Sequence, residues 1–277
     1  MTARPGARSR AKLQGGAESA FALWGRRWPD TGAGRYRLLR EPACRRVATA
    51  AVVGICAVGW TVPAAAYRPF DGTDAAVADV GEVEIEFQPI GVIHAGSAKA
   101  LSDTIVNYGF AERWEVVLQG TAQTPPEGAG PISVSNGAFL KYVLQPGVLQ
   151  EKQGPSVATE FGALLPQFGG SGLGFGLTGI VSQRWEWGTV HLNVATNLTP
   201  DQHGELFLDA IIEGPHKWTV RPVFEIYSDS VSNQTQTFSA LAGAIWQVND
   251  KLSFDAAVRY AVVNGRPVNE LRAGLTF

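Results

Sequence analysis

The last stretch of the sequence, residues 269–277, constrains the fold more than any other. Its residues alternate strictly between an apolar and a polar face, and a period of two indicates a β-strand with two unlike sides. A bare apolar strand at a chain end would leave a sticky edge in a soluble protein, whereas a closed barrel pairs its last strand with its first. We therefore expect an all-β protein, a closed antiparallel transmembrane β-barrel. The apolar face carries Leu271, Ala273, Leu275 and Phe277.

Residues 1–66 have the pattern of a targeting segment. Arg45 and Arg46 precede an apolar run at residues 47–60, and small residues follow at 63–66. These are the charged, apolar and small-residue regions of a secretory signal peptide, with cleavage expected after Ala66. The run is short for a membrane-spanning helix, so a retained anchor is the weaker alternative. We expect an N-terminal extension and cleaved signal peptide at 1–66 and an exported barrel at 67–277.

Alternating segments of about ten residues, the length of a tilted β-crossing of a bilayer, fill residues 82–277. Twelve segments form an even number, as closed bacterial barrels require. Most even-to-odd links are tight and the others are often longer, as in periplasmic turns and outer loops, except near 145–154. Residues 67–80 have loop composition. The expected strands are 82–95, 100–109, 112–122, 133–145, 155–166, 172–184, 186–199, 204–213, 217–229, 236–248, 251–263 and 268–277.

Tryptophan positions support the barrel independently of the strand count. Within 67–277 every tryptophan lies within a few residues of a tight link, and none is near the longer ones. Indole rings prefer the headgroup level of a bilayer, so these residues predict one aromatic girdle on the periplasmic side. The alternative is that they fill the core of a soluble sandwich. The predicted membrane-interface residues are Trp114, Trp185, Trp187, Trp218 and Trp246.

Strand parity predicts which side chains face the lumen. A charge that faces lipid at mid-bilayer costs about 2–4 kcal/mol, so the charged face must point inward. Closure of the last strand on the first is expected to place Arg272 and Glu270 beside the row Glu82, Glu84 and Glu86. Two interpretations remain open, a paired charge network that fills a small barrel and a polar conduit that selects solutes. The predicted lumen-lining residues are Glu84, Glu86, Arg113, Glu115, His191, Asp209, Arg221, Glu225, Asp255, Arg259 and Arg272.

The sequence argues against several functional classes. A net charge of −2 without a basic stripe excludes nucleic acid as an expected partner. The two cysteines, Cys44 and Cys56, precede residue 67, and the four histidines lack ligand spacing, so no metal or cofactor site is predicted. The sequence contains no G-x-S-x-G or H-E-x-x-H motif. We expect no enzyme; a membrane-embedded hydrolase stays a weak alternative, because His191 finds no convincing partner.

Short motifs carry a resemblance to a known family. Arg68-Pro69-Phe70, Thr73-Asp74-Ala75 and Gly81-x-Val83-Glu84-Ile85-Glu86 resemble the opening of the "meta-pathway of phenol degradation" outer-membrane proteins. The stretches 107–115 and 271–277 are similar to later parts of that family. The resemblance implies an outer-membrane channel or transporter for aromatic or other apolar compounds, and it transfers no site residues.

The sequence thus predicts an outer-membrane channel or transporter for small solutes. Its expected partners are the lipid bilayer, a small-molecule solute and the outer-membrane assembly machinery, which would recognise the strand that ends at Phe277. The alternatives are a structural barrel with a plugged lumen and, less favoured, the membrane-embedded hydrolase.

Overall fold

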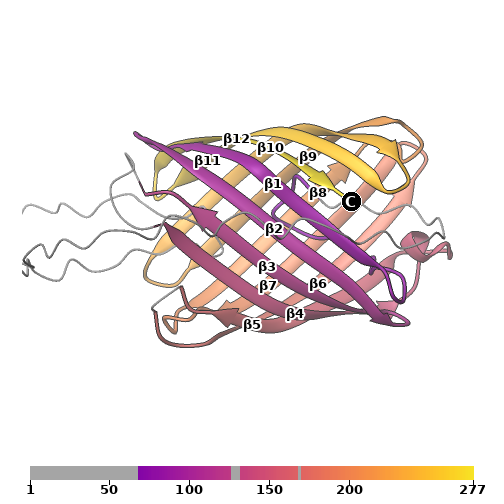
Figure 1. The fold of residues 1–277 in the computed structure, drawn as a ribbon, viewed down its shortest axis with the longest axis horizontal. Helices are drawn as coiled ribbons and strands as arrows, with labels where there is room; N and C mark the ends of the chain where they lie inside the picture. Colours follow the sequence, from indigo (N-terminus) through magenta and orange to yellow (C-terminus); the bar gives the residue numbers. More distant parts are fainter. Residues whose placement is uncertain (1–67, 126–131, 168–169) are drawn as a thin grey trace, which may run out of the picture.

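The computed structural model describes residues 68–125, 132–167 and 170–277. These residues form a closed antiparallel barrel in which each strand pairs with its neighbours in sequence and β1 pairs with β12 (Figure 1). The predicted fold class is confirmed, while the predicted signal peptide lies outside the described residues. The strands are β1 Val83–His94, β2 Ala98–Ala111, β3 Trp114–Gln123, β4 Ser133–Gln145, β5 Ser156–Leu165, β6 Gly174–Trp185, β7 Gly188–Leu198, β8 Gly204–Glu213, β9 Val220–Val231, β10 Thr235–Asn249, β11 Leu252–Val263 and β12 Arg266–Thr276.

Alternation in the sequence becomes an apolar outer wall and a mainly polar inner one. On β9, Phe224 and Ile226 are 42% and 49% exposed, whereas Glu225 between them is fully buried. The same alternation runs along β11, where Val258 is exposed and Arg259 is buried. Such a continuous apolar surface is unfavourable in water and suits the hydrocarbon core of a bilayer. No helix in the described part of the chain is long and apolar enough to cross a membrane.

The links between strands define two ends of the barrel. We call the end with the links 112–113, 146–155, 186–187, 214–219 and 250–251 the turn end, and the opposite end the loop end. Three loop-end links are also tight, 95–97, 232–234 and 264–265, so loop length separates the ends less cleanly than predicted. The turn-end link 146–155 is long, as its sequence indicated, and contains the 3₁₀ helix η2, Val148–Gln150.

The seam between β1 and β12 closes the barrel, but one predicted neighbourhood is wrong. Arg272 lies opposite Gly91 and Glu270 opposite Ile93, rather than beside the glutamates of β1. Glu86 lies opposite Thr276, four residues beyond Arg272, so the register at the end of β12 separates the carboxylate row from Arg272 along the seam. A bulge at Gln88–Pro89 adds a shift of one residue against both neighbours of β1. Proline has no N–H to donate to a neighbouring strand, so the bulge forms where the hydrogen-bond ladder could not be completed.

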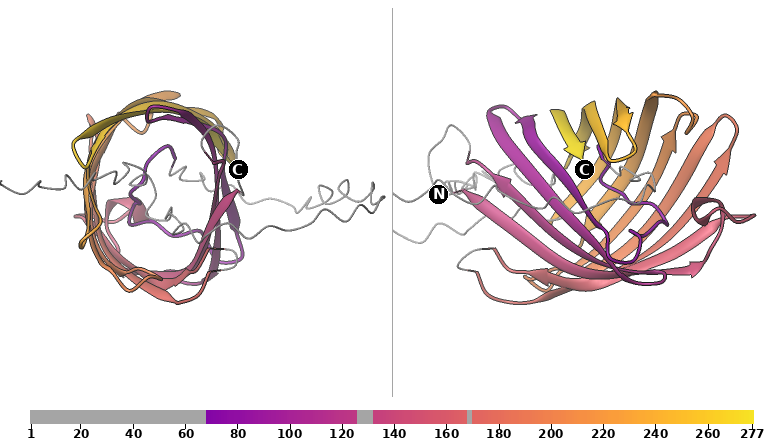
Figure 2. Two further views of the ribbon diagram at one scale, coloured as in Figure 1. Left: turned by 90° about the vertical axis from the view of Figure 1, so that its left-hand side faces the viewer. Right: turned by 45° about the vertical axis from the view of Figure 1, so that its right-hand side comes forward.

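A short segment before β1 lies inside the barrel. Residues 68–80, named here the plug segment, cross the interior of the oval ring in the view along the barrel axis (Figure 2, left). The sequence predicted a loop at 67–80 and placed it in no particular position. Arg68, Asp74 and Ala75 are buried although no strand contains them. The lumen is therefore partly filled by the protein's own chain.

The depth of the apolar wall can be tested with arginine. Val258 lies at the middle of β11 and Val248 near the turn end of β10, and both side chains are exposed. We expect Val258→Arg to destabilise the barrel by about 2–4 kcal/mol and Val248→Arg by about 0–1 kcal/mol, because the penalty falls toward the interface. Urea unfolding in liposomes measures both. Equal penalties would contradict a bilayer centred on the middle of β11.

Candidate functional site

Lumen carboxylates hold the plug segment by its backbone. The N–H groups of Asp71 and Gly72 both donate to Glu225 Oε1, at 2.6 and 3.0 Å, and the N–H of Ala78 donates to Glu115 Oε2 at 2.5 Å. An irregular segment at membrane depth has no water or ladder partner for its N–H groups, so it needs acceptors from the wall. These carboxylates supply charge-assisted bonds, which are stronger than neutral ones.

Arginines of β11 and β12 bind the plug segment beside Glu225. Arg259 contacts Asp71 and lies 3.3 Å from Glu225 and 3.6 Å from Glu270. Arg272 forms a two-pronged pair with Glu270, at 2.8 and 2.9 Å, and donates to the carbonyl oxygen of Pro69 at 2.8 Å. Removing one partner of such a buried network leaves an uncompensated charge, which costs about 3–5 kcal/mol. The network therefore fixes the plug segment against β9, β11 and β12.

The first residues of the plug segment bind strands on both sides of the seam between β1 and β12. Arg68 contacts Gln88, lies 3.3 Å from Asp103 and lies 3.9 Å from Asp255. Phe70 packs into an apolar cluster on the inner face of β8–β11, which the predicted polar interior did not include. We call the side of the lumen at β8–β12 the packed half. The cluster consists of Phe70, Ile211, Val223, Leu241, Ile245 and Ala257.

The long turn-end link folds onto the plug segment. Gln150 donates to the carbonyl oxygen of Ala75 at 2.9 Å, and Leu149 packs against a cluster of Ala75, Ala158 and Ile180. The N–H of Ala75 donates to Ser182 Oγ at 3.0 Å. The unusual length of 146–155 is thus explained by a contact inside the barrel.

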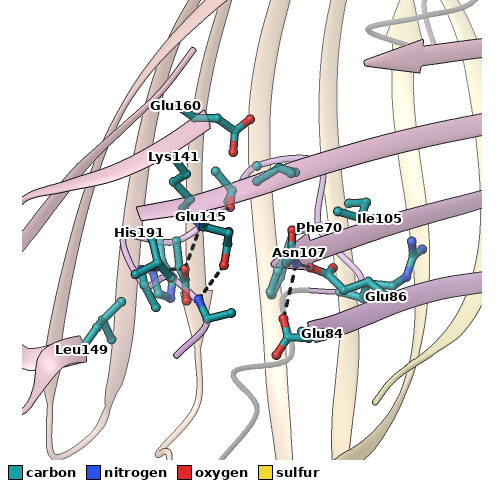
Figure 3. A pocket seen from close by; sticks show the side chains of 18 of the residues that line it. Phe70, Glu84, Glu86, Ile105, Asn107, Glu115, Lys141, Leu149, Glu160 and His191 are labelled. Carbon is teal, nitrogen blue, oxygen red and sulfur yellow. Dashed lines mark hydrogen bonds and ion pairs between the residues drawn. The ribbon is translucent and has the colours of Figure 1, made fainter. Parts of the chain in front are cut away.

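The other side of the lumen, at β1–β7, is named here the open half. It contains most of the lining of a cavity of about 1320 Å³, which Phe207, Arg221 and Arg272 also line. Its lining reaches from Asp250 and Lys251 at the turn end to Leu101 and Thr121, which lie toward the loop end of β2 and β3. Inward side chains from several strands meet there (Figure 3). The plug segment therefore forms one wall of a space that continues along the barrel.

Charge is unevenly distributed around the open half. Among the described residues, the charged side chains of β1–β5 that line the cavity are five carboxylates and one ammonium group. Lys141 donates to Thr73 Oγ1 at 3.2 Å and lies 3.5 Å from Asp74, so it is directed toward the plug segment. Arg68 of the plug segment also pairs with Asp103, at 3.3 Å, and the other carboxylates leave this wall acidic. The six residues are Glu84, Glu86, Asp103, Glu115, Glu160 and Lys141.

Two arginines, Arg184 and Arg221, line the cavity at the turn-end mouth, on the side of β6–β9, and Glu213 lies 3.7 Å from Arg221. His216 lines the cavity beside them. Partial burial lowers the pKa of His216 below its ordinary value, and the guanidinium of Arg184 acts in the same direction. The open half thus combines a basic rim segment with an acidic wall.

His191 has partners that the sequence did not reveal. Its Nδ1 lies 2.8 Å from Ser182 Oγ and its Nε2 lies 3.6 Å from Glu213 Oε1, which corrects the expectation of no convincing partner. A serine, a histidine and a carboxylate in line are also the components of a hydrolase. Ser182 is fully buried, however, and its oxygen accepts the N–H of Ala75, so the arrangement joins the plug segment to the wall.

The structure places the predicted lumen residues as follows. Glu84 and Arg221 are half-buried, and Arg113 belongs to the link 112–113 rather than to a strand, with a φ of 66° at the mouth of the cavity. The predicted strand began at residue 112, two residues before β3, so strand parity was applied to Arg113 where it does not hold. The buried ones are Glu86, Glu115, His191, Asp209, Glu225, Asp255, Arg259 and Arg272.

Sequence reasoning missed Arg68, Lys141 and Glu160 as lumen residues. Lys141 and Glu160 are lone charges within otherwise uncharged strands, directly opposite each other on β4 and β5. Their inward parity could have identified them. Arg68 precedes the first strand, so no periodicity could place it.

The five predicted interface tryptophans lie at or near the turn end. Trp185 and Trp187 are exposed and stack at 5.4 Å, and Trp218 and Trp246 are also exposed. Trp114 is half-buried against Tyr142, with ring centroids 4.4 Å apart. Phe277 is exposed and pairs with Ile85 through two backbone hydrogen bonds of 2.8 and 3.0 Å.

Solved structures of outer-membrane proteins are similar to this chain. A KdgM porin in complex with disordered oligogalacturonate shares 11% identity and a TM-score of 0.48, with 70% of this chain and 98% of the porin covered. The COG4313 outer membrane channel from Pseudomonas putida F1 shares 11% identity and a TM-score of 0.49, with 76% and 100% covered. The translocator domain of the autotransporter NalP from Neisseria meningitidis shares 9% identity and a TM-score of 0.43, with 72% and 89% covered.

No family model and no curated protein matches the sequence. The resemblance to the phenol-degradation family therefore stays a prediction. The barrel topology and the apolar outer wall define a transmembrane β-barrel of the outer-membrane type. Solute and mechanism must be inferred from the lumen itself.

A glycine provides a way to detach one end of the plug segment. A Cβ at Gly109 on β2 would overlap the carbonyl oxygens of Ala78 and Asp79. Overpacking costs about 1–3 kcal/mol, and the plug segment avoids it by moving off the wall. We expect Gly109→Ala to raise ion conductance and to expose residues 78–79 to protease. Gly179→Ala is the matched control, because a Cβ at Gly179 would have its nearest atom 4.0 Å away. Identical conductance and protease sensitivity of the two variants would contradict the contact between Gly109 and the plug segment.

Proposed function

We propose that the protein is an outer-membrane channel that passes small solutes through the open half of its lumen, beside the plug segment. The observation that supports this proposal is the cavity of about 1320 Å³, which is lined from the turn end toward the loop end while the plug segment is in place. A barrel with a structural role alone would have no need of a charged, continuous space along its axis.

The plug segment serves as a fixed wall of this channel. Glu225, Ser182 and Glu115 bind three separated points of its backbone, and Arg259 and Arg272 bind Asp71 and Pro69. Removing the segment would leave these wall groups without their partners in a site of low dielectric constant. Conduction past the segment avoids that cost.

The setting of the channel follows from the sequence and the outer wall. Residues 1–66 would export the chain as an extension with a cleaved signal peptide, and residues 67–277 would form the mature barrel. The turn end would face the periplasm, with its tryptophans at the headgroups. The strand that ends at Phe277 would be recognised by the assembly machinery.

The lining of the open half also suits solutes that have an apolar part. Ile105, Val117, Phe139 and Leu164 form an apolar cluster that lines the open half. An aromatic or aliphatic body could pass along this cluster, in agreement with the family resemblance. The hydrolase alternative is not favoured, because Ser182 is buried under the plug segment.

A reversible lock tests whether the plug segment is a fixed wall. Ala75 and Ala158 share one buried cluster, and residues 67–277 contain no cysteine, so Ala75→Cys with Ala158→Cys would create a single disulfide. We expect equal single-channel conductance in planar bilayers before and after reduction, because solutes pass beside the segment. The Ala158→Cys single variant is the control. Conductance that appears only after reduction would show that the segment must leave, and no conductance in any form would contradict the channel.

A further inference from the structure

We propose that the open half of the lumen contains a binding site for an organic cation, an ammonium group carried on an apolar body. This inference rests on the proposed channel and names the class of solute that the channel would select. The site lies where the acidic wall of β1–β5 meets the apolar cluster of β2–β5.

The carboxylate of Glu160 is the central observation. Glu160 is 8% exposed and lines the cavity from β5. Its cross-strand neighbour Lys141 directs its ammonium group to Thr73 and Asp74 on the plug segment. In the parts of the chain that the structure describes, no donor or cation lies within bonding distance of Glu160. Figure 3 shows its carboxylate directed into the cavity. A buried carboxylate in this position calls for a positive partner.

Neighbouring carboxylates extend the negative wall. Glu84 and Glu86 accept hydrogen bonds from the same amide nitrogen of Asn107, at 3.5 and 3.0 Å, which fixes both side chains on the lumen side (Figure 3). Glu115 lies 4.0 Å from Lys141, which is the one ammonium group among the described residues of β1–β5 that line the cavity. The negative charge is therefore spread over several carboxylates of the cavity wall and is not confined to Glu160.

An aromatic ring lies beside these carboxylates. Phe139 is opposite Gly162 on β5, and Gly162 is the next inward position after Glu160. A Cβ at Gly162 or at Gly176 would press on ring carbons of Phe139, at 2.8 and 3.2 Å. The ring therefore packs over the two glycines, on the inner wall that lines the cavity. An aromatic face beside a carboxylate is the chemistry that binds ammonium groups.

The arrangement suits an organic cation better than a metal ion. Within the described residues, no three His, Cys, Asp or Glu side chains converge closely enough to hold a metal. Metal ions such as Ca²⁺ need six to eight oxygen ligands close together. An ammonium group with an apolar body can instead place its charge near Glu160 and its body against Ile105, Val117 and Phe139.

Binding of benzyltrimethylammonium to the full-length mature protein, purified from membranes in detergent, tests the site by titration calorimetry. Benzenesulfonate and benzyl alcohol are the anionic and neutral probes. We expect only the cation to bind. Glu160→Gln should lower the affinity for the cation about tenfold, which corresponds to the loss of one charge-assisted contact. Glu186→Gln is the matched control, because Glu186 is exposed in the link 186–187 away from the cavity.

The outcomes separate this site from the channel. Equal binding of the three probes, or unchanged affinity in Glu160→Gln, overturns the cation site, whereas conductance measured in parallel decides the channel. Binding without conductance keeps the site and contradicts the channel. Phe139→Leu gives a second test, in which affinity for benzyltrimethylammonium must fall. Heat-dependent gel mobility shows that each variant is a folded barrel.

Discussion

Satisfaction of backbone hydrogen bonds without water is the constraint on which the whole structure depends. The strands meet it by closing into a ring, in which β1 pairs with β12. The plug segment cannot meet it in that way, because it is irregular and lies inside the ring. Its N–H groups therefore take Glu225, Glu115 and Ser182 as acceptors. The inner wall is polar partly because a non-strand segment must be bound there.

This requirement divides the lumen. The arginines and carboxylates that hold the plug segment, with the cluster around Phe70, fill the packed half. The open half also binds the segment, through Glu115, Lys141 and Ser182, but leaves the cavity beside it. The two sequence-based interpretations, a paired charge network and a polar conduit, therefore describe different halves of one barrel.

Local periodicity predicted most of the fold and little of the site. Alternation correctly places Glu225 and Arg259 inside and Phe224 and Val258 outside, because a strand has only two faces. It could not place Arg272 along the seam, since alternation gives the face of a residue but not the pairing register, in which Glu86 lies opposite Thr276. It also could not dock the plug segment, whose position depends on side chains more than a hundred residues away. The partners of His191 were missed for another reason: Ser182 and Glu213 lie on the two strands that flank β7, and parity does not give the register that brings them together.

A comparison of two glutamates shows how the plug segment determines what the lumen can bind. Glu225 and Glu160 are both inward and both buried, at 0% and 8% exposure. Glu225 accepts two backbone N–H groups of the segment and lies 3.3 Å from Arg259. Glu160 lies across the lumen, where the segment occupies Lys141 and leaves the carboxylate directed into the cavity. The same residue type is thus structural on one wall and available to a solute on the other, and the path of thirteen residues, 68–80, accounts for the difference.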